Sequence, residues 1–361
     1  MSVRRWFWAY RPTVPSARAQ SVQVVNAAHA MASMGHGVEL CVEGAVDARA
    51  ALEAYGLAPV DGLRIVCLPR SRTLASLAYR ARLSAFVART RGQGVVLARR
   101  KRHAAWARRW LGRRFHLLIE AHEVDSALAL ERGDDAGAAL ALERSVLREA
   151  FGVVCNAPGT LRWLQEVHPH GPPATVVHNA ARPGLVPAPD AVGVGVIGSV
   201  RPDKDPWTVA EAARRCRHPV TWVGVDRDRD ELIRRSDGRL VVEEPLRPAD
   251  VPARASRCRV LLVPLSHGLF GDAMTSPLKL WDALASGVPI VAADTPAVRD
   301  VVQDAALLYR PGDPSSLAAA LDRACEDEAL RTALVGAARQ RARTWEQRAS
   351  EIAAFVDGCL G

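Results

Sequence analysis

The segment 192–216, VGVGVIGSVRPDKDPWTVAEAARRC, contains the pattern that is repeated along the chain. Its first six residues are valine, isoleucine or glycine, which predicts a short buried strand over Val192–Ile197. Residues Pro206–Cys216 place apolar side chains at helical spacing, and proline suits the first turn of a helix. The segment therefore predicts a strand, a turn at Gly198 and a helix, which is the repeating unit of a parallel sheet covered by helices.

The same alternation extends in both directions and predicts two domains. Upstream, strands are expected over Val38–Val42, Leu63–Leu68, Gly94–Leu97, Leu117–Glu120, Val153–Cys155 and Thr175–Val177, and helices over Ser21–Met34, Leu74–Arg89, His103–Leu111, Ala136–Ala150 and Gly159–Val167. Downstream, strands are expected over Val220–Val223, Leu240–Val242, Val260–Val263 and Pro289–Ala292, and helices over Asp228–Arg235, Pro248–Ala255, Pro277–Ser286, Ala297–Val302 and Ser315–Glu326. The proline-rich segment His178–Ala191 separates the two series. The fold class is therefore α/β, with two doubly wound domains and a ligand cleft at the carboxyl ends of their strands.

Composition places the chain among ordinary globular proteins. Of its 361 residues 49% are hydrophobic, and no stretch approaches the roughly 20 apolar residues of a membrane span. The first residues lack the apolar core of a secretory signal peptide. The seven cysteines are scattered, which favours reduced thiols over a disulfide framework or a zinc site. These features predict a cytoplasmic protein.

The charge is unevenly distributed. Residues 1–120 carry 20 Lys and Arg against 6 Asp and Glu, whereas residues 121–361 carry 28 against 33. A basic half favours an anionic partner, with a solvated arginine-rich surface as the alternative. Residues 99–114 form a basic amphipathic stretch that fits a surface helix or contact with an anionic lipid surface, so a membrane-peripheral location is the second interpretation. Nucleic acid is not expected, because no reader motif accompanies the charge.

Two glycine-containing patterns fall on the same turn. Gly193, Gly195 and Gly198 spell G-x-G-x-x-G, but two of them lie inside the predicted strand, which disfavours dinucleotide binding. Beyond the turn, Arg201 and Lys204 precede a helix start, where backbone N–H groups favour an anion. Two cations there predict a clamp for a diphosphate, and two solvated loop cations are the alternative.

The segment Ala273–Pro289, AMTSPLKLWDALASGVP, gives the strongest functional signal. Thr275 and Ser276 precede Pro277 in a pattern that begins a helix and leaves N–H groups for a second anion contact. Lys279 and Asp282 are three residues apart and share one helix face, which fits a phosphate contact beside a ribose contact. A capped helix with an internal Lys–Asp pair is the alternative.

Two further groups of residues have weaker signals. His122 follows the strand Leu117–Glu120, at the end of a sheet where ligand-facing residues gather, although a lone histidine is more often structural. Asp226, Asp228 and Asp230 are interleaved with arginines, which favours a solvated turn over a metal site. No metal or cofactor is therefore expected.

Together these segments resemble a retaining glycosyltransferase of family 4, which has the GT-B fold. The resemblance rests on six stretches spread over nearly the whole chain: Ser16–Leu40, Leu117–Asp125, Leu142–Ala157, Gly198–Asp205, Thr275–Val302 and Arg343–Ala349. It implies an acceptor-binding domain over residues 1–185, completed by a closing helix within 343–361, and a donor-binding domain over residues 186–342.

The resemblance also implies roles for individual residues. Arg201 and Lys204 would hold the donor diphosphate, Asp282 the ribose, and His122 the donor sugar, and these four form the expected catalytic set. The remaining donor contacts would be Gly198, Ser199, Thr275, Ser276, Leu278, Lys279 and, beside the base, Leu246 of the segment Glu243–Leu246. The acceptor contacts would be Arg18, Gln20, Ser21 and Glu123. Three positions depart from the family pattern: Ser199 stands where arginine is usual, and Met274 and Asp282 stand where two glutamates are usual.

The expected function is therefore metal-independent transfer of a sugar from a nucleoside diphosphate sugar, UDP before GDP, with retention of anomeric configuration. The acceptor is expected to be a small molecule, a natural product or a lipid-linked glycan. A nucleotide-sugar epimerase or hydrolase on the same fold is the first alternative. A non-catalytic transferase-like subunit is the second, because of Ser199 and Met274, and a dehydrogenase ranks last.

Overall fold

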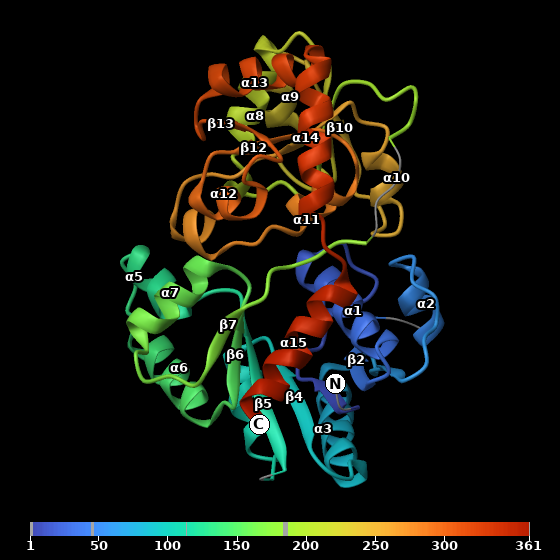
Figure 1. The fold of residues 1–361 in the computed structure, drawn as a ribbon, viewed down its shortest axis with the longest axis vertical. Coiled ribbons are helices and arrows are strands. Elements are labelled where there is room, and N and C mark those ends of the chain that lie inside the picture. The colour runs from blue at the N-terminus through green and yellow to red at the C-terminus, as the bar shows by residue number, and fades with distance from the viewer. Residues whose placement is uncertain (1–2, 45–46, 113, 183–186, 361) are drawn as a thin grey trace. The chain divides into compact units, whose positions relative to one another are not determined.

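The computed structural model describes residues 3–44, 47–112, 114–182 and 187–360, and Figure 1 shows their fold. The chain divides into two compact units. The first comprises Met1–His178 together with Trp345–Gly361, and the second comprises Asn179–Thr344. The boundary expected between residues 185 and 186 lies outside the described residues. No helix in the described part of the chain is long and apolar enough to cross a bilayer.

The first unit is built on a seven-stranded parallel sheet with the order β3-β2-β1-β4-β5-β6-β7. Its strands are β1 (Arg5–Trp8), β2 (Gly37–Val42), β3 (Leu63–Cys67), β4 (Gly94–Ala98), β5 (Phe115–Ala121), β6 (Gly152–Cys155) and β7 (Ala174–Val176). Its helices are α1 (Ala19–Ser33), α2 (Ala48–Glu53), α3 (Arg72–Arg89), α4 (Lys101–Arg108), α5 (Asp125–Glu131), α6 (Gly137–Glu149), α7 (Pro158–Val167) and α15 (Trp345–Leu360). The direction of strand succession reverses between β1 and β4, and in doubly wound sheets such a position is where ligands usually bind.

The strand β1, in the interior of this sheet, was not predicted from the sequence. Arg5 pairs with Gly37 of β2 on one side and with Gly94 of β4 on the other. Trp6, Phe7 and Trp8 are all buried, because both faces of the sheet are covered. A strand buried on both faces shows no alternation of apolar and polar residues, and this run is too short to be distinguished by length.

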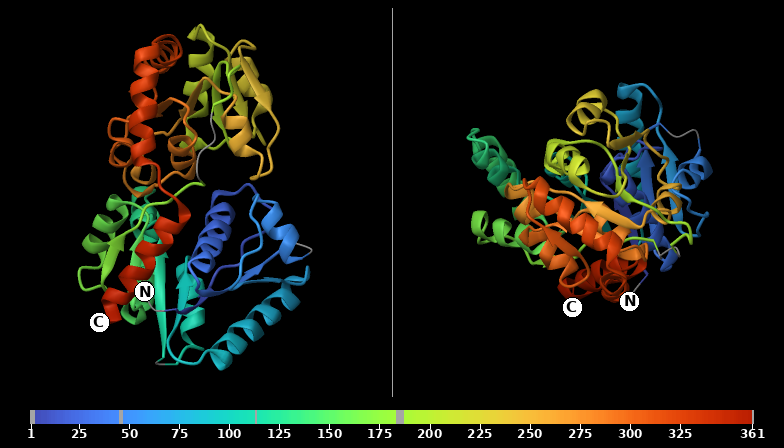
Figure 2. Two further views of the ribbon diagram at one scale, coloured as in Figure 1. Left: turned by 45° about the vertical axis from the view of Figure 1, so that its right-hand side comes forward. Right: turned by 90° about the horizontal axis from the view of Figure 1, so that it is seen from above.

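The last helix, α15, completes the first unit. It packs along α1 and also contacts β6, and Figure 2 shows it in two further views. A side chain at Gly152 of β6 would stand 2.8 Å from the ring of Phe355, so the glycine lets this helix approach the sheet. Its Arg348 is fully buried and forms an ion pair with Glu120 of β5.

The second unit contains a six-stranded parallel sheet with the order β10-β9-β8-β11-β12-β13. Its strands are β8 (Val194–Ile197), β9 (Val220–Val223), β10 (Leu240–Glu243), β11 (Val260–Val263), β12 (Ile290–Ala293) and β13 (Leu307–Tyr309). Its α-helices are α8 (Pro206–Arg215), α9 (Arg229–Arg235), α10 (Val251–Ala255), α11 (Leu278–Ala285), α12 (Pro296–Val302), α13 (Pro314–Glu326) and α14 (Glu328–Arg341). A 3-10 turn, η1 (Pro202–Lys204), and a π-helical turn, η2 (Phe270–Met274), complete it. The strand order reverses between β8 and β11.

The predicted α/β class with two parallel sheets is confirmed. The valine- and alanine-rich strands and the apolar faces of the helices form one buried cluster in the second unit. Strand β13 and helices α2, α5 and α14 were not anticipated. Gly195 lies inside β8, where a Cβ would stand 2.3 Å from the Cys258 sulfur. That glycine therefore serves close packing in the sheet.

Candidate functional site

The turn after β8 brings backbone and lysine into direct contact. Gly198 has a φ of +125°, and a Cβ there would stand 2.1 Å from Nζ of Lys279. Two hydrogen bonds fix the turn: the Gly198 N–H donates to the Val223 carbonyl at 2.7 Å, and Trp222 Nε1 donates to the Gly198 carbonyl at 2.7 Å. Glycine is therefore required at this position for two reasons: it can adopt this backbone conformation, and it leaves room for the ammonium group.

The loop that follows supplies two more cations. Asp203 accepts a hydrogen bond from Arg201 Nε at 2.8 Å and forms an ion pair with Lys204 Nζ at 3.0 Å. Arg201 is exposed, whereas the Lys204 side chain retains only 15% of its accessible surface. Burial lowers the pKa of Lys204, and the Asp203 carboxylate opposes that shift. Asp203 thus holds both cations at the carboxyl end of β8, beside the position where the strand order reverses.

Helix α11 carries the other two charged groups of this site. Burial, and then the nearby Lys204 ammonium, lower the pKa of Lys279 to about 7. Burial raises the pKa of Asp282, and the cations Arg182 and Lys279 oppose that shift. Asp282 keeps more than a third of its surface accessible, so water moderates its shift. Among the described residues Lys279 and Asp282 form no direct ion pair, although each charge affects the pKa of the other.

Thr275 and Ser276 lie just before Pro277, which is the N-cap residue of α11. Thr275 and Ser276 are buried, and no side chain caps α11. The Ser276 hydroxyl accepts a hydrogen bond from Trp281 Nε1 at 3.0 Å, and its carbonyl accepts one from Asn179 Nδ2 at 2.7 Å. Ser276 therefore fixes the start of the helix through tryptophan and asparagine, and Pro277 at the N-cap position makes no side-chain hydrogen bond to the first N–H groups of α11.

The remaining residues that were expected to contact the donor lie in the same unit. Ser199 is exposed directly after Gly198, Leu278 is half-buried in the first turn of α11, and Leu246 is half-buried in the segment between β10 and α10. In the segment expected to border a base, Glu243 accepts two hydrogen bonds from Arg254, at 2.9 and 3.0 Å. That pair fixes the end of β10.

In the first unit, His122 belongs to a buried network of charged residues. Its Nε2 lies 2.8 Å from Arg99 Nη1 and 3.5 Å from Glu120 Oε1. The same Glu120 oxygen accepts from Gln23 Nε2 at 2.6 Å and pairs with Arg348. Burial would raise the pKa of Glu120, but Arg348 and His122 outweigh it, so that the pKa lies well below its usual range. Nothing in the sequence indicated that Arg99, Gln23 and Arg348 belong to this network, because they come from distant segments.

The contact with Arg99 determines the protonation of His122. An arginine side chain only donates hydrogen bonds, so Nε2 must accept, and the single ring proton then lies on Nδ1. Burial, followed by the Arg99 charge, lowers the pKa of His122 to about 4. At neutral pH the ring is therefore uncharged and has Nδ1–H available to donate.

A second set of hydrogen bonds and ion pairs holds the loop after His122 in place. Lys101 Nζ donates to the Glu123 carbonyl at 2.6 Å and pairs with Asp125 at 2.9 Å. The buried Glu143 accepts the Asp125 N–H at 2.8 Å and bonds His168 Nε2 at 3.1 Å. This second network makes the position of the histidine loop rigid.

The expected acceptor residues are also in the first unit, and they differ in exposure. Arg18 and Glu123 are exposed and Gln20 is half-buried, accepting from Arg100 at 3.5 Å. Ser21 is buried in the first turn of α1 and hydrogen-bonds Tyr55.

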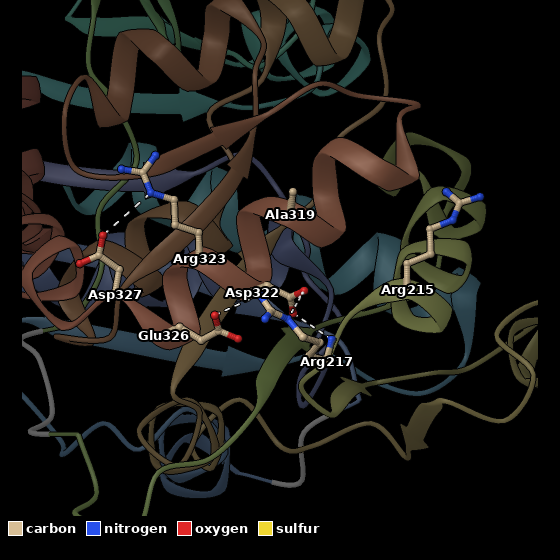
Figure 3. A pocket seen from close by; sticks show the side chains of 7 residues that line it. All are labelled: Arg215, Arg217, Ala319, Asp322, Arg323, Glu326 and Asp327. Atoms are coloured by element: carbon tan, nitrogen blue, oxygen red, sulfur yellow. Dashed lines mark hydrogen bonds and ion pairs between the residues drawn. The ribbon is translucent and has the colours of Figure 1, made fainter.

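A separate hollow on the second unit has a volume of about 700 Å³ and contains none of these residues (Figure 3). Its charges neutralise one another: Arg217 pairs with Asp322 at 3.1 Å and with Glu326 at 3.0 Å, and Arg323 pairs with Asp327 at 4.0 Å. Within the described ranges, the hollow included, no group of three His, Cys, Asp or Glu side chains could hold a metal ion.

A known protein family matches part of the second unit. Residues 191–327 match the family described as Glycosyl transferases group 1. The matched region contains β8 to α13, and therefore the Gly198 turn and α11 with their cations. No curated protein sequence matches the chain.

Solved structures resemble the chain over nearly its whole length. Sucrose-phosphate synthase from Thermosynechococcus elongatus has a TM-score of 0.77 and 16% identity, covering 99% of both chains. HepE from Anabaena, in complex with UDP and glucose, has a TM-score of 0.72 and 15% identity, covering 98% of this chain and 100% of its own. An α,α-trehalose-phosphate synthase (UDP-forming) from Burkholderia vietnamiensis has a TM-score of 0.67 and 13% identity, covering 99% of this chain and 100% of its own. At these identities the likeness establishes the fold, which is that of the GT-B glycosyltransferases.

Proposed function

We propose that this protein transfers a sugar from a nucleoside diphosphate sugar, with UDP as the preferred nucleotide. The observation that carries the proposal is the group of three cations, Arg201, Lys204 and Lys279, gathered at the Gly198 turn beside the uncapped start of α11. The family match covers this region, and HepE, a structural neighbour, was solved with UDP-glucose.

The charges of the site fit a diphosphate leaving group. When the glycosidic bond breaks, negative charge develops on the diphosphate, and preorganised cations stabilise it most where water is excluded. Lys279 lies against the Gly198 backbone, and Lys204 is largely buried, so both ammonium groups have little freedom to reorganise. Asp282 would accept hydrogen bonds from the ribose hydroxyls. With three protein cations in place of a metal ion, we propose metal-independent transfer.

In this proposal His122 binds the sugar and is not a general base. Its Nε2 lone pair is already used by Arg99, and the free Nδ1–H group donates to an oxygen. Retention of anomeric configuration is part of the proposal, and it rests on the resemblance to family 4. The exposed side chains of Arg18 and Glu123 would contact the acceptor.

Calorimetric titration with UDP, GDP, ADP, TDP and NAD, each with EDTA and with magnesium, tests the donor site. We expect UDP to bind equally in both conditions and Lys204→Ala to weaken it. Binding by NAD alone, or no nucleotide binding, would overturn the proposal. Incubation with UDP-glucose and without acceptor, followed by NMR, then separates transfer from hydrolysis, because only a hydrolase releases free glucose under these conditions. With an acceptor present, the anomeric configuration of the product reports retention or inversion.

A further inference from the structure

Arg99 carries a positive charge that no carboxylate neutralises directly. It follows β4 and His122 follows the adjacent β5, so both lie at the carboxyl edge of the sheet, and β4 borders the position where the strand order reverses. The Nη1 group of Arg99 donates to Gln23 Oε1 at 2.5 Å and to His122 Nε2 at 2.8 Å. Both acceptors are uncharged at neutral pH, and within the described residues Arg99 forms no ion pair. Its contacts therefore orient the guanidinium group without balancing its charge.

The neighbouring charges leave an excess of positive charge around Arg99. The buried carboxylate of this network, Glu120, is already paired with Arg348, so that one carboxylate faces two guanidinium groups. Exposed Glu123 and exposed Arg100 carry opposite charges and offset each other. Burial lowers the pKa of Arg99, yet an arginine stays protonated in proteins. A desolvated charge without a partner costs free energy, and an anion at this position would remove that cost.

One edge of the Arg99 guanidinium group is open. In the part of the chain that the structure describes, its Nε and Nη2 atoms form no hydrogen bond, and both retain accessible surface. In a guanidinium group the Nε–H bond and one Nη2–H bond are parallel, which is the geometry that binds a carboxylate or a phosphate through two hydrogen bonds. Arg100, the next residue, adds a second cation, and its guanidinium lies 5.7 Å from the Tyr10 ring.

We propose that the open edge of Arg99 binds an anionic group, a carboxylate or a phosphate ester, on one of the substrates. Water or a sugar hydroxyl would accept the hydrogen bonds of this edge but would leave the excess charge in place. An anion accepts both hydrogen bonds and neutralises the charge. The inference rests on the proposed sugar transfer, because that function makes the anion part of a donor sugar or of an acceptor.

An NMR titration of the full chain with inorganic phosphate tests the binding site, with and without UDP. The ring signals of His122 are the reporter, because its Nε2 bonds Arg99. We expect a saturable shift in the wild type, and roughly 10-fold weaker binding or less in Arg99→Gln, from the loss of a charged hydrogen bond. Arg99→Lys keeps the charge without the two parallel N–H groups and should bind with intermediate affinity. The matched control is Arg91→Gln, which removes an exposed cation before β4, at the opposite edge of the sheet, and should bind as the wild type does.

Assays with charged and neutral substrates identify the source of the anion. If the donor sugar carries it, Arg99→Gln weakens the binding of UDP-glucuronate and not of UDP-glucose. If the acceptor carries it, Arg99→Gln raises the KM for hexose 6-phosphates or hexuronates and not for the neutral hexoses.

Three results would overturn the proposal: no shift of the His122 signals in the wild type, a shift that UDP abolishes, or an Arg99→Gln protein that binds phosphate like the Arg91→Gln control. A protein that shows the Arg99-dependent shift but binds no nucleotide would instead overturn the proposed sugar transfer and keep the anion site. The two proposals can therefore fail separately.

Discussion

Replacing Gly198 by alanine tests whether this glycine exists to admit the Lys279 ammonium. The added Cβ would stand 2.1 Å from Nζ and 2.2 Å from Cε of Lys279, so the lysine must leave its place. The backbone at φ +125° adds strain on the order of 1–3 kcal/mol to the folded state of an alanine variant. The substitution should therefore lower both the affinity for the nucleotide and the free energy of unfolding. The two effects can be measured separately.

The expected loss of affinity follows from one charged contact. A hydrogen bond to an ionised group contributes about 1.5–3 kcal/mol, so removing Lys279 from the diphosphate should raise the Kd for UDP roughly 10- to 150-fold. Titration calorimetry measures the Kd, and urea denaturation measures the free energy of unfolding. Lys279→Met should raise the Kd by a similar factor without the backbone strain.

The matched control is Gly238→Ala in the same unit. Gly238 also has a positive φ, +73°, but no atom lies within 4 Å of its Cβ position. This variant should be less stable than the wild type and bind UDP with unchanged affinity. A folded Gly198→Ala protein that binds UDP as tightly as the Gly238→Ala control would refute the reasoning, and so would a Lys279→Met protein with wild-type affinity.

Three other predictions concern the charged networks. Arg348→Met leaves Glu120 buried without its cation and should lower the free energy of unfolding by about 3–5 kcal/mol in urea denaturation, whereas exposed Arg239→Met should change it little; equal effects would contradict the buried pair. Arg99→Gln should raise the pKa of His122 from about 4 in an NMR titration and slow sugar transfer while the Kd for UDP stays constant; an unchanged pKa would show that Arg99 does not control the ring. Lys279 is protonated below its pKa of about 7, so UDP affinity should fall as the pH rises above about 7, and Lys279→Met should flatten that dependence; a steeper profile in the variant would assign the titration elsewhere.

The alternation of apolar runs predicted most of the fold, because strands and helices of a parallel sheet differ in length and period. Strand β1 was missed, since Arg5–Trp8 is short, aromatic and buried on both faces. Two local motifs on neighbouring turns predicted a group of cations, and the structure places Lys279 against Gly198, next to the loop that carries Arg201 and Lys204. What Ser276 does could not be predicted, because its partners, Asn179 and Trp281, are known only once α11 is packed.

The residues around His122 show the limit of local patterns more clearly. Glu120 and His122 are two positions apart, but Gln23, Arg99 and Arg348 reach them from three other segments. Nothing near Arg348 in the sequence distinguishes it from the many solvated arginines of the chain. Only the arrangement of β5, α1 and α15 in space brings these charges together.

The position of Arg348 has a consequence for biosynthesis. A ribosome completes the whole second unit before it makes α15, and until then the first unit lacks both the helix that packs on α1 and the cation that neutralises Glu120. Domains that emerge first usually fold first. Here the earlier unit is completed only by Trp345–Gly361, which follow the second unit in the chain, so the two units do not become complete in the order in which they emerge. The ion pair between Glu120 and Arg348 therefore forms only in chains that have been translated past α15.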